Sequence, residues 1–194
     1  MTLPVLPYLL SATGQVQHAD GSPLGAQQVD ANQISVPHLT PHVERWPLPR
    51  GDTPGVLIRY SCHCWTSSHD PAFHAGELRI MDGKRPRVRD MVRLDASRDL
   101  PMFMRQLDRH RIYVTASERN YGVYNMAFTA PDGLAYTAYF LLRPQAGRFN
   151  RHRHKLVLTV ESAYHTVQPQ KGSKTSLSAV LAAGLQGRVV KYRR

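Results

Sequence analysis

Residues 148–166 read RFNRHRHKLVLTVESAYHT, and this stretch decides the fold. Three arginines, one lysine and two histidines lead into apolar and β-branched residues that alternate as in a long strand. Such a run of cations weakens a small fold by like-charge repulsion unless an anion binds nearby. The stretch therefore predicts a strand whose basic end meets RNA or DNA.

The charged residues are unevenly distributed along the 194-residue chain, whose formal net charge is +11. Residues 1–54 contain two basic and four acidic residues, so residues 55–194 contain the remaining 23 basic and 10 acidic residues. This asymmetry predicts a polyanion-binding body with a slightly acidic leader. Solubility alone is the alternative interpretation of the charge.

The two cysteines, Cys62 and Cys64, lie two residues apart in a strand-like segment. On one strand they point the same way, which is poor geometry for a disulfide. No apolar run approaches the roughly 18 residues of a membrane helix, and the N-terminus lacks the basic start of a signal peptide. We therefore expect a cytoplasmic protein with no membrane partner and no cofactor.

The sequence pattern divides the chain into three parts. Residues 1–54 are an extended leader rich in Pro, Gln and His, because the prolines prevent a long helix. Residues 55–166 form a basic α+β domain, and residues 167–194 form a C-terminal helix and a basic tail. The leader is expected to be an irregular arm.

The middle part contains one helical pattern and several strand-like segments. The helix is expected over 98–110, and Asp82-Gly83 is the expected turn of a hairpin. The expected strands are 56–65, 77–81, 87–94, 111–116, 121–128, 134–142 and 155–165. This order favours an α+β fold in which an antiparallel sheet of four or more strands packs on the amphipathic helix.

Strand alternation assigns the last strand to two faces. Leu156, Leu158, Val160, Ser162 and Tyr164 form the expected core face, and Val157, Thr159, Glu161, Ala163 and His165 form the open face. Glu161 or His165 would move the proton of an RNA 2′-hydroxyl there, and an arginine would balance the developing charge. The alternative for Glu161 is an ion pair with an arginine of the neighbouring strand.

Two further groups of residues have a functional and a structural interpretation. Arg85, Arg87 and Arg89 form a basic stripe that suits phosphate contacts or protects an edge strand. The second group consists of zinc-ligand types, Cys62, Cys64, His69 and His74. Its spacing fits no common zinc finger, so the main expectation is no metal, with this set as the alternative.

One helix followed by four strands, the last carrying Glu161-Ser162-Ala163-Tyr164, resembles the barnase–EndoU–colicin–RelE (BECR) group of ribonucleases over residues 97–166. The resemblance implies metal-independent RNA cleavage, with Ser162, Tyr164 and His165 at the site and Arg151 or His152 before it. The chain departs from the group in its long leader and in the strand and hairpin before the helix.

The sequence thus predicts a nucleic-acid-binding protein that is a metal-independent endoribonuclease of toxin or mobile-element type. The alternative is a non-enzymatic, phage- or plasmid-encoded nucleic-acid-binding or inhibitor protein. RNA or DNA is the expected partner, and a cognate inhibitor or host protein is a further one. The expected catalytic residues are His165, Glu161, Tyr164, Ser162 and His152. The expected nucleic-acid contacts are Arg85, Arg87, Arg89, Arg148, Arg151, Arg153 and Lys155.

Overall fold

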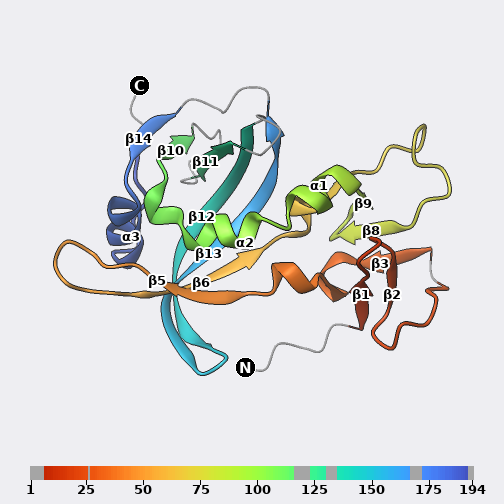
Figure 1. Cartoon of the computed structure of the whole chain (residues 1–194), viewed down its shortest axis with the longest axis horizontal. Coiled ribbons are helices and arrows are strands. Elements are labelled where there is room, and N and C mark those ends of the chain that lie inside the picture. The colour runs from red at the N-terminus through yellow and green to blue at the C-terminus, as the bar shows by residue number, and fades with distance from the viewer. Residues whose placement is uncertain (1–6, 26, 116–122, 130–134, 167–171, 192–194) are drawn as a thin grey trace.

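The computed structural model describes residues 7–25, 27–115, 123–129, 135–166 and 172–191. These residues form a mixed α and β structure that is mostly sheet (Figure 1). Sheets of three, seven and four strands are found within the described ranges. The coarse prediction of a chain mixing helices with sheet is confirmed. Predicted segments that cover residues 116, 121–122, 134, 167–171 and 192–194 lie outside the described residues.

The seven-stranded sheet is the centre of the fold, and its long hairpin comes from the quoted stretch. Its strands, in spatial order, are β14 (Ser173–Thr175), β10 (Ile112–Thr115), β11 (Val123–Thr129), β12 (Ala135–Phe149), β13 (His152–Thr166), β6 (Gly55–Tyr60) and β5 (His42–Arg45). β13 pairs in parallel with β6, and the other neighbours are antiparallel. The apolar run of β6 is buried from Val56 to Ile58, as expected for a strand inside a sheet.

A β-bulge at Glu161 reverses the alternation of β13. Phe140 pairs with Val160, but Tyr139 pairs with Ser162, so Glu161 is the extra residue. Ala163 is consequently fully buried on the same face as Val160. The expected division into two faces is therefore correct up to Val160 and wrong beyond it. His165, expected on the open face, lies on the core face opposite Tyr136.

The leader contains paired strands rather than an irregular arm. β1 (Tyr8–Leu10), β2 (Val16–His18) and β4 (Ile34–Ser35) form the three-stranded sheet, and β3 (Gln28–Asp30) pairs with β8 (Arg79–Asp82). β5 is the edge strand next to β6. Trp46 is 4% exposed, and its indole N–H donates to the Arg105 carbonyl at 3.4 Å. These contacts attach the described leader residues to the body of the fold.

The four-stranded sheet contains the expected hairpin. Its order is β3, β8, β9 (Arg85–Arg89) and β7 (Thr66–Ser68). Asp82 pairs with Arg85 around a two-residue turn, and Gly83 has a φ of +59°, a value that glycine adopts without strain. The strand expected over 56–65 is shorter, because Ser61 caps a 3₁₀ helix, η3 (Cys62–Cys64).

The single helix expected over 98–110 is divided in the structure. It is replaced by α2 (Leu100–Arg105) and a 3₁₀ helix, η4 (Leu107–Arg109). The strand expected over 87–94 is wrong beyond Arg89, because a further helix, α1 (Met91–Ala96), follows β9 there. Asp90 caps α1 and Pro101 lies in the first turn of α2, where its missing N–H costs no helical hydrogen bond. Leu100, Met104 and Leu107 keep the predicted spacing and are fully buried.

The remaining helices are short. They are α3 (Leu177–Leu185) and two 3₁₀ helices, η1 (Ala31–Gln33) and η2 (Pro37–Leu39). α3 packs closely on the core face, where a Cβ on Gly184 would meet Leu142 Cδ2 at 2.7 Å. Within the described ranges, no helix has the length and apolar character needed to cross a membrane.

Candidate nucleic-acid interface

The outer part of the β12–β13 hairpin, residues 143–155, is called the hairpin arm below. β11 pairs with β12 only as far as Phe140, and β6 pairs with β13 only from Leu156 onward. The arm is therefore a two-stranded ribbon that extends beyond its sheet. Figure 1 shows it projecting past β5 and β6, away from α2.

A tight turn and a histidine shape the arm. Asn150 and Arg151 have φ angles of +44° and +68°, which form the two-residue turn between Phe149 and His152. Holding Arg151 in this left-handed region costs about 1 kcal/mol. The buried His154 shares a hydrogen bond of 3.0 Å between its Nδ1 and the Gln145 carbonyl. His154 therefore supports the arm from within.

The exposed side chains of the arm are strongly cationic. Five cations are exposed on it: Arg143, Arg148, Arg151, Arg153 and Lys155. The arm contains no Asp or Glu, and Arg148 lies directly opposite Arg153. Like charges directly opposite each other destabilise a strand pair. The arm thus carries positive charge that its own residues do not neutralise.

Strand register places most of these cations on one face. Arg143 pairs with Val157 and Arg59 pairs with Thr159, so these residues share the face that carries Arg148, Arg153 and Lys155. We call this the outer face. The opposite face carries Leu156 and Leu158, and α3 packs there. A long anion lying along the outer face would meet cations from three strands.

The basic stripe expected on β9 is not continuous. Arg87 is 7% exposed, and it donates from Nε to Thr66 Oγ1 at 2.6 Å and from Nη2 to the Thr66 carbonyl at 3.0 Å. Arg89 donates to the Gly14 carbonyl at 2.8 Å. Of the three predicted contacts, Arg85 alone is exposed. Arg87 and Arg89 therefore hold protein segments together.

The expected catalytic residues are spread along β13. His152 lies at the turn of the arm, thirteen residues before His165, which corresponds to roughly 40 Å at about 3.3 Å per residue. The Glu161 carbonyl accepts a hydrogen bond from Ser61 Oγ at 2.5 Å, and the described residues provide no ion pair for its carboxylate. The structure does not bring Glu161, His165 and His152 together.

The aromatic end of β13 is packed against other side chains. His165 faces Tyr136 with ring centroids 5.4 Å apart. Tyr164 and Ser162 lie on the other face, where Tyr164 stacks on Tyr139 at 5.6 Å. The Arg93 guanidinium lies 4.8 Å from the centre of the Tyr164 ring. Tyr164 is thus part of a cation–π stack.

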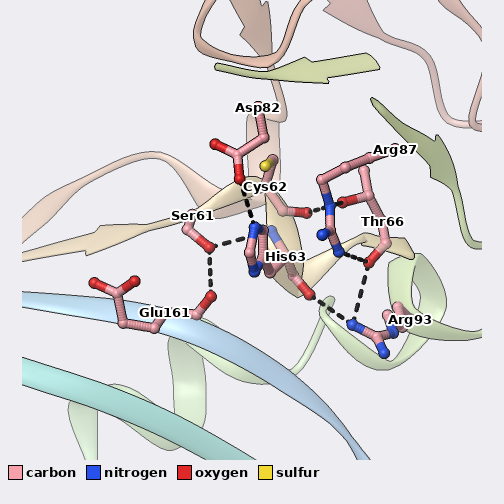
Figure 2. A network of polar contacts seen from close by, with 8 residues as sticks. All are labelled: Ser61, Cys62, His63, Thr66, Asp82, Arg87, Arg93 and Glu161. Atoms are coloured by element: carbon pink, nitrogen blue, oxygen red, sulfur yellow. Dashed lines mark hydrogen bonds and ion pairs between the residues drawn. The ribbon is translucent and has the colours of Figure 1, made fainter. Parts of the chain in front are cut away.

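A polar network around η3 was not anticipated from the sequence. His63 Nε2 lies 2.8 Å from Asp82 Oδ2, at the start of the β8–β9 turn. Figure 2 shows this pair beside Cys62. Burial and the nearby Asp82 carboxylate raise the pKa of the Cys62 thiol to about 11. An Asp-Gly turn is itself a sequence signal, but nothing in the pattern links it to a histidine 19 residues earlier.

The alternative zinc set is divided among separate places. Cys64 is fully buried and its thiol lies 3.7 Å from the Val160 carbonyl. His69 and His74 lie beside each other between β7 and β8, with ring centroids 5.7 Å apart. Within the described ranges, the group of three possible metal ligands that lie close together is Cys62, His63 and Asp82.

The family model of the YjaZ family matches the chain over residues 26–185. The chain belongs to the YjaZ family. The range shared with YjaZ includes the hairpin arm, η3 and the second half of the predicted leader. No curated protein and no solved structure matches the chain significantly.

Proposed function

We propose that this YjaZ-family protein binds nucleic acid through the hairpin arm. The observation that carries the proposal is a projecting two-stranded ribbon with five exposed cations and no carboxylate. The major groove of B-form DNA is about 12 Å wide and admits such a ribbon. Single-stranded RNA also offers a phosphate chain that an exposed basic face can follow.

The proposal sets the expected dependence of binding on salt. Each phosphate contact on duplex DNA contributes about −0.9 to the slope of log affinity against log salt concentration. Five contacts give a slope of about −4.5, so affinity falls roughly 500-fold for a fourfold rise in salt.

The test uses fluorescence polarisation of the full chain with labelled duplex DNA and labelled single-stranded RNA across a salt titration. The double variant Arg148→Ala, Arg153→Ala is expected to reduce the steepness of the DNA slope by about two. The matched control removes the same charge from the β8–β9 turn, where Lys84 and Arg85 are exposed. An equal loss in Lys84→Ala, Arg85→Ala would show that overall charge, and not the arm, binds the phosphates.

RNA cleavage through a 2′,3′-cyclic phosphate is the second candidate function, and one observation favours it. His152 is exposed at the turn of the arm beside Arg151, where its imidazole would lie close to a bound phosphate chain. Incubation with total RNA in EDTA tests it. Cleavage that is lost in His152→Ala while affinity is kept would support an endoribonuclease. RNA that stays intact at micromolar protein concentration would refute the endoribonuclease and favour a non-enzymatic nucleic-acid-binding protein.

The helix packing and the cysteines agree with the proposed role. The burial of Leu100 and Met104 supports a sheet backed by an apolar helix face, the arrangement that underlies the resemblance to the BECR ribonucleases. The free thiols of Cys62 and Cys64 support a reducing, cytoplasmic location. We also propose a cognate inhibitor or a host protein as a further partner.

A further inference from the structure

Three donor atoms of different chemistry meet between η3 and the β8–β9 turn. The Cys62 thiol, the His63 imidazole and the Asp82 carboxylate each offer an atom, and these atoms all lie within 4.8 Å of one another. His63 and Asp82 are partly exposed, at 30% and 38% of their side-chain surfaces. The cluster lies well away from the hairpin arm in sequence: η3 directly follows β6 of the seven-stranded sheet, and Asp82 ends β8 of the four-stranded sheet.

The backbone that carries Cys62 and His63 is held on several sides. Thr66 Oγ1 donates to the Cys62 carbonyl at 2.7 Å, and Arg93 Nη1 donates to the His63 carbonyl at 3.2 Å. Ser61 Oγ accepts from the His63 N–H at 3.1 Å. Figure 2 shows these bonds surrounding η3. Donor groups on so constrained a turn are positioned before any ligand arrives.

The donor spacing is close to that of a tetrahedral metal site. Metal–donor distances of about 2.0–2.3 Å place tetrahedral ligand atoms roughly 3.3–3.6 Å apart. The 2.8 Å separation of His63 Nε2 and Asp82 Oδ2 must therefore lengthen slightly. Donor pairs nearer the 4.8 Å limit must shorten by about 1 Å. These changes require rotations of the Cys62 and Asp82 side chains, both of which are partly exposed.

We propose that Cys62, His63 and Asp82 bind a zinc-class divalent cation. A thiolate and an imidazole beside one carboxylate match the preference of Zn²⁺ and Co²⁺, whereas Mg²⁺ and Ca²⁺ require mostly oxygen ligands. Cys62 and Asp82 also line a groove of about 540 Å³ with Tyr60 and Trp65. Three protein ligands beside a groove leave the fourth position open to water or a small ligand.

Cobalt titration of the full chain, without a histidine tag and under reducing conditions, tests the site. Wild-type protein is expected to bind one Co²⁺, with a near-ultraviolet thiolate charge-transfer band and visible bands that Zn²⁺ abolishes. Cys62→Ser should remove the charge-transfer band, and Asp82→Asn should weaken binding at least about tenfold. Cys64→Ala and the double variant His69→Ala, His74→Ala are the controls, because the sequence groups those residues with Cys62.

Each result decides for or against the site. The proposal is overturned if wild-type protein gives no charge-transfer band, or if the controls lose the band while Cys62→Ser keeps it. Circular dichroism of each variant reports folding. If Cys62→Ser does not fold, Asp82→Asn provides the decision, because its side chain is partly exposed at a turn. Unchanged cobalt affinity in Asp82→Asn then refutes the proposal, and a tenfold loss supports it.

Discussion

Replacing Ala163 with leucine tests the bulge in β13, on which the assignment of the two faces depends. Ala163 is fully buried and lies opposite the equally buried Ala138, so a leucine would push three more carbon atoms into the packed core. Overpacking of this kind costs about 1–3 kcal/mol. For a chain of this length the melting temperature should fall by about 2–4 °C for each kcal/mol.

Urea unfolding followed by the fluorescence of the buried Trp46 and Trp65 measures this free energy. The matched control is Ser162→Leu, which adds a similar volume one residue earlier on the other face and should change the free energy by less than about 1 kcal/mol. The reverse order, with Ala163→Leu neutral and Ser162→Leu destabilising, would refute the bulge. Glu161 and His165 would then share the open face, as simple alternation predicts.

Two further predictions concern buried polar groups. Arg87→Ala should lower the free energy of unfolding, measured in urea, by about 1.5–3 kcal/mol, because Thr66 loses two hydrogen bonds from a charged donor. An effect no larger than that of Arg85→Ala, at an exposed position, would contradict this prediction. Acidification below pH 6.5 should also lower this free energy, because burial holds the pKa values of His38 and His42 below their ordinary 6.5 and the unfolded chain binds more protons there. The double variant His38→Gln, His42→Gln should be less sensitive to pH between neutrality and about pH 5.5, and an unchanged pH profile would refute the assignment.

The sequence correctly predicted those elements whose conformation is determined by neighbouring residues along the chain. The alternation of residues 155–165 lies in β13, and Asp82-Gly83 forms the turn between β8 and β9. The basic end of β13 is exposed as its composition predicted. In each case the signal lies within about ten consecutive residues, so it does not depend on knowing the partner strand.

The missed features depend on distant partners. Nothing around Glu161 marks a bulge, because the extra residue is visible only against Tyr139 and Phe140 of β12. The leader strands are two to four residues long, too short for a period to emerge, and β3 finds its partner β8 about 50 residues later. The sequence around Arg87 is that of an exposed cation, and its burial depends on the contact with Thr66, 21 residues earlier. The His63–Asp82 pair was missed for the same reason, because its members lie 19 residues apart.

The parallel pairing of β6 with β13 has a consequence for synthesis of the chain. Val56 pairs with Leu156, so β6 leaves the ribosome one hundred residues before its partner. At about 5–20 residues per second, β6 remains unpaired on that edge for roughly 5–20 s. Its apolar run can pair meanwhile with β5, which is synthesised earlier. An early β5–β6 hairpin would shield one edge of a strand that otherwise invites aggregation or chaperone binding, which gives the leader a role in biogenesis.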